Sequence, residues 1–301
     1  MPVLLLLLAT LSWGGNFPVA KWLSSGSGQS TFLALGPVEL AMWRWTLAAV
    51  IVLLFFRKGV REMFSALAEH WKIMFVLAFL SVSTFNTLIY IGLQSTTAIN
   101  AALLNIMLPI FIMLMGALIY RDKIGSSHII SIALGFIGLV LIVCQGDINR
   151  LLGLKFVHGD LIVTLAMLFY AFYSVTLRKR PPISATALLS GCILLGLPVL
   201  VLAAAFTGIN TTPFSWSGQT WLGMAYLAVF PSLVAILCWN TGVQMIGAVK
   251  ASLFILTAPI FGGLFSVLLL GEALKAYHFA ALGFVAFAIW LSYRKQSTAK
   301  T

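Results

Sequence analysis

Residues 98–120 of the chain read AINAALLNIMLPIFIMLMGALIY, and residues 248–270, which follow 150 positions later, read AVKASLFILTAPIFGGLFSVLLL. Each stretch is long and apolar enough to form a helix across the roughly 30 Å of hydrocarbon in a bilayer. Both carry the tripeptide Pro-Ile-Phe at the matching place, beginning at Pro109 and at Pro259. The pair therefore indicates a membrane protein that contains an internal repeat.

The repeat extends well beyond these two stretches. An ungapped shift of 150 places residues 71–128 on residues 221–278 with 15 identities in 58 positions. Two unrelated apolar segments would share Leu and Ala by composition, but shared Trp, Gln, Pro and His are not explained in that way. The pairs of this kind are Trp71 with Trp221, Gln94 with Gln244, Pro109 with Pro259 and His128 with His278.

The composition agrees with a chain whose main solvent is lipid. Of its 301 residues, 61% are apolar and 8% are charged, whereas about 25% of the residues in soluble domains are charged. Mean hydropathy is +1.06. A net charge of +11 in a soluble protein would indicate nucleic acid as a partner. Here most Lys and Arg lie in short gaps between apolar runs, so we expect no nucleic-acid partner and interpret the charge as a topology signal.

Runs of about 20 predominantly apolar residues, bounded by charged or turn residues, mark candidate membrane helices. Ten such runs lie near residues 3–22, 37–56, 72–93, 98–120, 127–145, 159–177, 184–206, 220–243, 249–270 and 276–293. The gap from Arg57 to Trp71 is interpreted as a charged loop. The sequence therefore predicts an all-α polytopic membrane protein with ten transmembrane helices.

Lys and Arg are distributed unevenly between the two sides of this predicted helix array. Alternate gaps place thirteen on the side of the N-terminus and four on the opposite side, while Arg44 lies inside the second run. Short cytoplasmic loops carry the excess of Lys and Arg in membrane proteins. We therefore expect a multi-pass protein of the cell inner (plasma) membrane, with both termini in the cytoplasm.

Each half of the chain holds five of the ten runs, and five is odd, so the second half must enter the membrane from the opposite side. We expect two inverted-topology five-helix repeats, residues 1–148 and residues 149–301. Two such bundles can exchange conformations around a central site, which then opens first to one side of the membrane and then to the other.

Several features together resemble one known group of proteins. They are the five-plus-five helices, Trp13-Gly14-Gly15-Asn16-Phe17 in the first run, Arg44 in the second, the Pro109 and Pro259 helices, and the Gly271-Glu272 turn. The chain is similar to the drug/metabolite transporter (DMT) superfamily and, more narrowly, to its EamA-type ten-helix exporters. The resemblance implies this fold and export of amino acids, other metabolites or drugs. The chain departs from the family at Arg121-Asp122, where the first repeat usually ends in Gly-Glu.

Polar residues inside the predicted helices mark a candidate substrate cavity, because polar groups that face lipid are costly. The candidate substrate-binding residues are Trp13, Asn16, Asn86, Tyr90, Asn105, Tyr170, Tyr173, Trp239 and Asn240. Pro109 and Pro259 are interpreted as hinges, since proline removes a backbone N–H and kinks a helix. The alternative for each amide is a hydrogen bond to a neighbouring helix, with no role in transport.

Arg44 is the charged residue that lies deepest within a run, between Trp43 and Trp45. An unpaired guanidinium at such a depth costs about 2.5–3.5 kcal/mol on insertion scales, so we expect a compensating interaction. One interpretation is structural, with Glu39 as the partner or with the guanidinium extended toward the headgroups. The other is substrate binding, with Arg44 as an anchor for a carboxylate. The structural interpretation is favoured, because the second repeat has no counterpart near Ser190.

The sequence shows no pattern typical of proton coupling, a metal site or catalysis. Glu39, Asp122, Asp160 and Glu272 all lie at helix ends, which favours a facilitator or exchanger over a proton-coupled antiporter. Three Cys and four His show no metal-ligand spacing, and no acid pair or Ser–His dyad is placed at depth. We therefore expect no catalytic residues, no metal and no cofactor, and not an enzyme.

The functional hypothesis is a secondary-type transporter that exports small metabolites, such as amino acids or related compounds, from a cavity between the two repeats. Its partners are then a small-molecule substrate and the lipid bilayer. The alternatives are a drug or lipid exporter of the same fold, and a non-transporting membrane scaffold or receptor. Gly135 and Gly138 in the fifth run suit either a homodimer contact or helix packing inside one chain.

Overall fold

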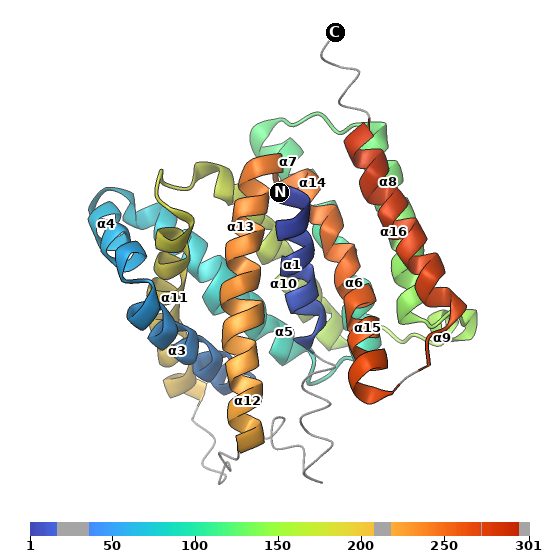
Figure 1. The fold of residues 1–301 in the computed structure, drawn as a ribbon, viewed down its shortest axis with the longest axis horizontal. Coiled ribbons are helices and arrows are strands. Elements are labelled where there is room, and N and C mark those ends of the chain that lie inside the picture. Colours follow the sequence, from blue (N-terminus) through green and yellow to red (C-terminus); the bar gives the residue numbers. More distant parts are fainter. Residues whose placement is uncertain (17–35, 208–217, 272, 295–301) are drawn as a thin grey trace.

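The computed structural model of the chain describes residues 1–16, 36–207, 218–271 and 273–294. All regular structure in these ranges is helical, and the helices form one bundle (Figure 1). Eight helical segments are long and apolar enough to cross a membrane: Pro37–Phe55, Arg57–Gly92, Asn100–Tyr120, Ser126–Val143, His158–Lys179, Ala185–Thr207, Trp221–Ile246 and Ala248–Leu268. Two shorter apolar helices, Pro2–Gly14 and Ala276–Ser292, accompany them. The protein is therefore an all-helical, polytopic membrane protein.

The elements follow one another in two series along the chain. The first series is α1 (Pro2–Gly14), α3 (Pro37–Phe55), α4 (Arg57–Ala78), the π-helix η2 (Phe79–Phe85), α5 (Asn86–Gly92), α6 (Ala98–Leu104), α7 (Met107–Tyr120), α8 (Ser126–Val143) and the short α9 (Ile148–Leu152). The second series is α10 (His158–Thr176), η3 (Leu177–Lys179), α11 (Ala185–Thr207), α12 (Gly218–Leu227), the π-helix η4 (Ala228–Val234), α13 (Ala235–Ile246), α14 (Ala248–Ser252), η5 (Leu253–Thr257), α15 (Ala258–Leu270) and α16 (Ala276–Arg294).

The segment from Arg57 to Trp71, expected to be a charged loop, is helical, because α4 begins at Arg57. One face of the segment is buried against α11: a Cβ on Gly59 would meet the backbone of Thr186 at 2.9 Å, and Met63 is buried. The charged residues occupy the other face, which is the pattern of an amphipathic helix. The helix then bends at His70, whose φ of −118° and ψ of 18° are not helical.

The helices pack into a central group with a pair of helices on one side and three helices on the other. Figure 1 shows α8 beside α16 at one edge of the bundle and α3, α4 and α11 together at the other, in agreement with their contacts. Between them, α1 packs against α13 and α15, while α10 packs against α5 and α7. Helices from the two series therefore alternate through the centre of the molecule.

Four of the longer helical segments are interrupted, and the interruptions fall at matching places in the two series. A shift of 150 residues brings η2 onto η4 to within one residue. The same shift brings the turn at Asn105 and Ile106, which separates α6 from α7, into η5, which separates α14 from α15. The four interrupted segments thus form two matched pairs, and in each pair the interruptions fall at positions that correspond under the repeat in the sequence.

Apolar side chains fill the centre of the bundle and also cover its outside. Buried residues such as Trp45, Leu77 and Leu108 form a large core cluster, and a smaller cluster lies between α8, η5 and α16. Other large apolar side chains point outward: Leu118 is 86% exposed and Phe206 is 89% exposed. In water such exposure would be unfavourable, whereas lipid tails solvate it.

Gly135 and Gly138 serve the packing of helices inside the chain. A Cβ on Gly138 would lie 2.8 Å from a methyl carbon of Val285 and 2.9 Å from the carbonyl oxygen of Ala281, both on α16. A Cβ on Gly135 would lie 2.2 Å from Leu256. Glycine at these positions allows α8 to approach α16 and η5 closely.

Candidate functional site

A cavity of about 620 Å³ lies between helices of the two series. Its walls come from both, including α1, α5 and α6 of the first and α10, α15 and α16 of the second. The polar side chains among its lining are Asn16, Asn86, Tyr90, Gln94, Asn105, Gln145, Tyr170, Ser266, Tyr277 and His278, together with the indole of Trp13. No Asp, Glu, Lys or Arg is among the described residues that line it.

Aromatic rings form one wall of the cavity. Trp13 meets Tyr170 edge to face, with ring centroids 5.9 Å apart and an interplanar angle of 86°. Phe85 lies 4.4 Å from Tyr170 on the other side, and all three residues line the cavity. The indole N–H of Trp13 donates to the backbone oxygen of Pro231 at 3.1 Å, which fixes the ring and links α1 to η4.

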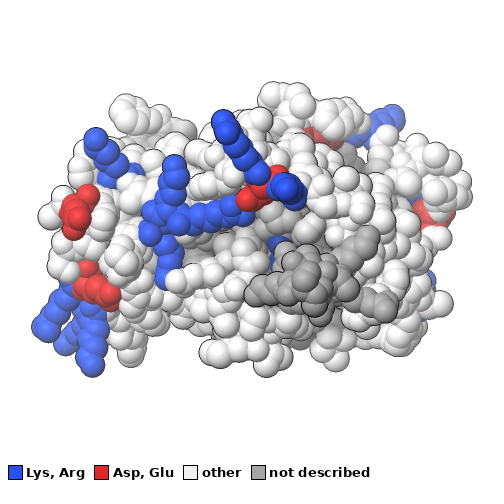
Figure 2. Space-filling view, turned by 90° about the horizontal axis from the view of Figure 1, so that it is seen from above, with Lys and Arg blue, Asp and Glu red and all other residues white. Residues whose placement is uncertain are grey.

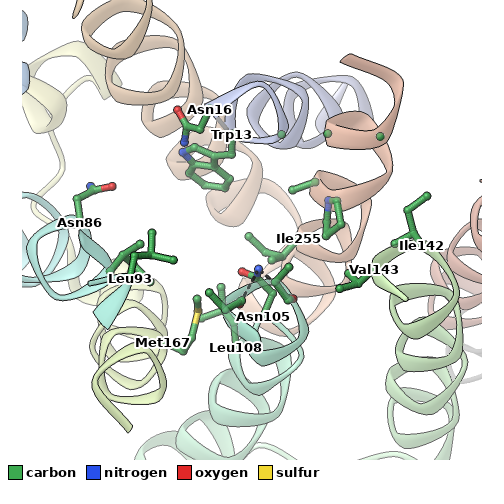
Figure 3. Close-up of a pocket in the computed structure, with 18 of the residues that line it drawn as sticks. Trp13, Asn16, Asn86, Leu93, Asn105, Leu108, Ile142, Val143, Met167 and Ile255 are labelled. Carbon is green, nitrogen blue, oxygen red and sulfur yellow. Dashed lines mark hydrogen bonds between the residues drawn. The ribbon is translucent and has the colours of Figure 1, made fainter. Parts of the chain in front are cut away.

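Asn86 and Tyr90 occupy successive turns of α5 and line the cavity; Asn86 is labelled in Figure 3. Behind them lies Arg44 of α3, which is 1% exposed and is not part of the cavity wall. One guanidinium nitrogen, Nη1, donates to Oδ1 of Asn86 at 3.1 Å and to the hydroxyl oxygen of Tyr90 at 2.8 Å. The cost of burying the charge of Arg44 is therefore offset by neutral hydrogen-bond acceptors rather than by an ion pair with Glu39.

A third acceptor for Arg44 comes from the opposite half of the chain. Its Nε donates to Oγ of Ser232 in η4 at 2.6 Å, and Oγ of Ser232 in turn donates to the carbonyl oxygen of Leu227 at 2.7 Å. Pro231 lies inside η4 and has no N–H to offer this carbonyl. The serine hydroxyl therefore links the backbone of η4 to Arg44, since it donates to one and accepts from the other.

Asn105 lines the cavity from the turn between α6 and α7. Its amide nitrogen donates to the backbone oxygens of Ala101 at 3.4 Å and Ala102 at 3.2 Å. Asn16 lies at the end of α1, and its Oδ1 is buried without a hydrogen-bond partner among the described residues. Figure 3 shows Asn16, Asn86 and Asn105 on separate walls around the same space.

Three of the candidate residues lie one layer behind the wall. Tyr173 donates its hydroxyl proton to Oδ1 of Asn240 at 2.6 Å, and both residues are buried. Trp239 is also buried; its indole N–H donates to Oγ of Ser174 at 3.3 Å, and its ring lies 5.5 Å from that of Trp13. None of the three lines the cavity, so they are placed to support the aromatic wall.

The two proline residues lie where the matched helices resume after their breaks. Pro259 is in the first turn of α15 and lines the cavity, and Pro109 is buried near the start of α7. Proline is well tolerated in the first turn of a helix, because the N–H it lacks would have no partner there. The breaks thus lie before the prolines rather than at them.

Asp160, a helix-end carboxylate in the sequence, is buried away from the cavity. Its carboxylate accepts from Thr96 Oγ1, from Asn100 Nδ2 at 3.0 Å and from the backbone N–H of Val157 at 2.8 Å. These bonds cap the start of α10 and tie it to the connection before α6. Phe17 and Glu272 lie outside the described residues.

Three residues of the site carry no clear signal in the sequence. Gln145 and His278, which line the cavity, lie at the ends of predicted runs and outside the polar stripes. Ser232, which contacts Arg44 behind the wall, is an ordinary small residue in an apolar run. The repeat did contain one hint, since His278 matches His128. Ser232 could be found only from the buried Arg44, which needs a partner.

Comparisons with known proteins agree over nearly the whole chain. The EamA-like transporter family matches residues 1–144 and 157–294. A Bacillus subtilis protein named Uncharacterized transporter YyaM is 29% identical over 263 residues, which cover 85% of this chain and 82% of that protein. An Archaeoglobus fulgidus protein named Uncharacterized transporter is 25% identical over 283 residues, covering 93% and 92% of the two chains.

A solved crystal structure has the same fold. It superimposes with a TM-score of 0.79 and covers 100% of this chain and 99% of its own, at 16% sequence identity. The match in family and the relatives named as transporters point to transport rather than to enzymatic catalysis. This chain, a multi-pass membrane transporter, belongs to the EamA-like transporter family.

Proposed function

We propose that the protein exports small metabolites, namely amino acids or related compounds, by alternating access at the central cavity. The observation that carries the proposal is a cavity of about 620 Å³ that is walled by both halves of the chain, is mainly apolar and carries a few polar groups. Ligand sites of small molecules have this size and this composition. A packed centre would have favoured a scaffold instead.

Alternating access requires two comparable bundles, and the matched elements support ten crossings in two inverted repeats, residues 1–148 and 149–301. The contact of α1 with α13 has its counterpart in the contact of α10 with η2 and α5, and the contact of α1 with α15 has its counterpart in that of α10 with α7. The matching π-helices and matching breaks support the same arrangement. Repeats of this kind exchange conformations around a central site.

We place the protein in the inner membrane of the cell, with both termini in the cytoplasm. The start of α1 and the end of α16 lie on the same face of the bundle (Figure 1). Seen from that face, Lys and Arg side chains gather over the surface and outnumber Asp and Glu (Figure 2). Excess positive charge is typical of the cytoplasmic side.

In this orientation the cavity belongs to the outer half of the protein. Its lining includes Trp13 at the end of α1, Pro37 at the start of α3 and Tyr277 at the start of α16. At the inner face, an ion pair connects the two halves. Nη1 and Nη2 of Arg178 in η3 donate to Oδ1 and Oδ2 of Asp122, which follows α7, at 3.0 Å and 2.5 Å. We interpret the structure as outward-facing, with this pair separating when the inner side opens.

The lining also favours exchange or facilitated movement over proton coupling. A proton-coupled carrier usually holds a titratable carboxylate near the substrate, and the described part of the cavity wall holds none. The buried carboxylate of Asp160 is committed to the cap of α10.

Counterflow into proteoliposomes tests the proposal. Purified protein is reconstituted with a high internal concentration of each member of an amino-acid panel, and uptake of the same labelled compound is followed. We expect saturable uptake for part of the panel and a several-fold loss in Asn86→Leu. Asn149→Leu, on the exposed α9, is the matched control and should leave uptake unchanged. Absence of saturable uptake for every compound would contradict the proposal and favour a drug or lipid substrate, or a scaffold.

A further inference from the structure

We propose that the cavity has two hydrogen-bonding poles of opposite polarity, and that buried Arg44 creates the pole that receives the carboxylate of a zwitterionic substrate. This inference rests on the proposed transport of amino acids and related compounds and states how such a compound is held. The first pole, called the donor pole, consists of Asn86 and Tyr90. The second, called the acceptor pole, is Asn105.

The polarity of the donor pole follows from what lies behind it. A guanidinium has N–H donors and no acceptor, so the atom of the Asn86 amide that faces Arg44 must be the carbonyl oxygen. The amide N–H groups of Asn86 are then available to the cavity. Tyr90 accepts from the same nitrogen through its oxygen, so its own O–H proton is likewise free to donate. Both oxygens lie within 3.1 Å of one nitrogen, which places the two donors side by side.

The polarity of the acceptor pole follows from the same argument, with the roles of donor and acceptor exchanged. Backbone carbonyls accept and do not donate, so the contacts of Asn105 with Ala101 and Ala102 must be made by its amide nitrogen. Its Oδ1 is therefore the atom left for the cavity. Oδ1 of Asn16 is buried and is not available to the cavity. The amide oxygen of Asn105 suits an ammonium group, and so does the ring of Trp13, which also lines the cavity.

The buried charge of Arg44 adds an electrostatic preference to this geometry. Its hydrogen-bond partners among the described residues, Ser232, Asn86 and Tyr90, are all neutral. No carboxylate of the described cavity wall offsets the charge. An anionic group bound at Asn86 and Tyr90 would offset the charge of Arg44, which lies one side-chain layer behind these residues. A lipophilic cation at the same place would be repelled by that charge.

Binding to matched ligands tests the two poles without requiring transport. The probes are leucine, methionine and phenylalanine, the corresponding amino-acid amides, the decarboxylated amines and the acids that lack the ammonium group. Their affinities are measured from ligand-induced shifts in the melting temperature of the purified full-length protein in detergent. We expect each amino acid that binds to bind about tenfold or more tightly than its amide or its amine, because hydrogen bonds to a charged group are the strong ones.

Two variants separate the donor pole from a general effect on folding. Tyr90→Phe removes the cavity-facing hydroxyl and should abolish most of the preference for amino acid over amide. Tyr120→Phe makes the same chemical change at the end of α7, outside the cavity wall, and should leave the preference unchanged. Asn105→Leu should instead reduce the preference for the amino acid over the acid that lacks an ammonium group.

Arg44→Gln tests the positioning role. We expect the affinity for amino acids to fall about tenfold while the affinity for amides stays within about twofold, because only the anionic ligand gains from the guanidinium. If this variant fails to fold, Tyr90→Phe carries the test. Amides or amines that bind as tightly as amino acids, or equal losses for both in Arg44→Gln, would overturn the two-pole arrangement and leave the proposed transport standing. Absence of binding by every probe would contradict both.

Discussion

Individual side chains of the cavity are oriented by residues that do not touch it. Arg44 lies behind the cavity wall and binds the side-chain oxygens of Asn86 and Tyr90. Ser232, from the opposite half of the chain, accepts a hydrogen bond from Arg44. Buried polar networks of this kind are stable only when each member has its partner. The consequences of removing one member therefore extend to the others.

Ser232→Ala should lower the free energy of unfolding by about 1–3 kcal/mol. The change removes the acceptor for Nε of the buried Arg44 and also the bond from the serine hydroxyl to the carbonyl oxygen of Leu227. Thermal unfolding of the purified protein measures the effect. Ser65→Ala, at an exposed position of α4, should change the melting temperature little; equal effects in the two variants would argue against the network.

Trp239→Ala should be among the most destabilising single changes, at about 3–5 kcal/mol, because it empties a fully buried site between Trp13 and Tyr170. Trp71→Ala removes an indole that is 56% exposed and provides the comparison. A melting temperature for Trp239→Ala as high as that of Trp71→Ala would show that the aromatic layer is less rigid than described.

At the scale of elements, the ends of α7 and α15 show how the two halves diverge. Both helices end with a left-handed residue, Arg121 with φ of 57° and Gly271 with φ of 69°, and the N–H groups of these residues bond to the oxygens of Gly116 and Ser266. These four positions match under the shift of 150. Glycine adopts this conformation without the steric cost that a Cβ carries.

Arg121→Gly should therefore raise the free energy of unfolding by about 1 kcal/mol. Arg121→Ala removes the same charge but keeps the Cβ, so it should bring no such gain. Thermal or chemical unfolding of the two variants distinguishes relief of backbone strain from a charge effect. A gain shared equally by both would assign it to charge.

The contact between α8 and α16 offers a second test. Gly138→Val places methyl groups against the backbone of Ala281 and the side chain of Val285, so we expect a loss of about 2 kcal/mol or more. A Cβ at Gly283, on α16, would meet no other described residue outside its own helix within 4 Å, so Gly283→Ala should be neutral or stabilising. Stability of Gly138→Val at the level of the wild type, with a changed oligomeric state, would instead support the dimer interpretation.

The positions of the helices could be predicted because hydropathy reports directly on the solvent of each segment, and the repeat fixed their correspondence. Polar spacing located Asn86, Tyr90 and Asn105, because it indicates a face of a helix. It does not indicate depth, so Asn240, one layer behind the wall, could not be separated from them. The contact between Arg44 and Ser232 joins residues 188 positions apart, and no local pattern predicts it.

At the scale of the whole molecule, the proposed orientation places the ion pair between Asp122 and Arg178 at the inner ends of the two halves and the cavity toward the outside. Both side chains are partly exposed, at 32% and 34%, so the pair adds little to stability. Its expected effect is on the balance between two conformations that differ by a few kcal/mol.

Asp122→Asn should shift the population toward the inward-facing form. Spin labels at Lys123→Cys and Lys179→Cys, on exposed positions of the two halves, report the separation of the inner ends by pulsed electron paramagnetic resonance. We expect a longer distance to gain population in Asp122→Asn. Asp147→Asn, which removes a carboxylate at the start of α9, should leave the distribution as in the wild type, and an unchanged distribution in Asp122→Asn would remove the pair from the mechanism.

The central claim is that one cavity is reached in turn from both sides of the membrane. The most direct test is Asn105→Cys in a chain whose native Cys144, Cys192 and Cys238 have been replaced, labelled with a membrane-impermeant maleimide in oriented vesicles. The account predicts labelling from the outer side in the absence of substrate, and labelling from the inner side when Asp122→Asn is added. Protection from both sides, or access from one side only under all conditions, would contradict it.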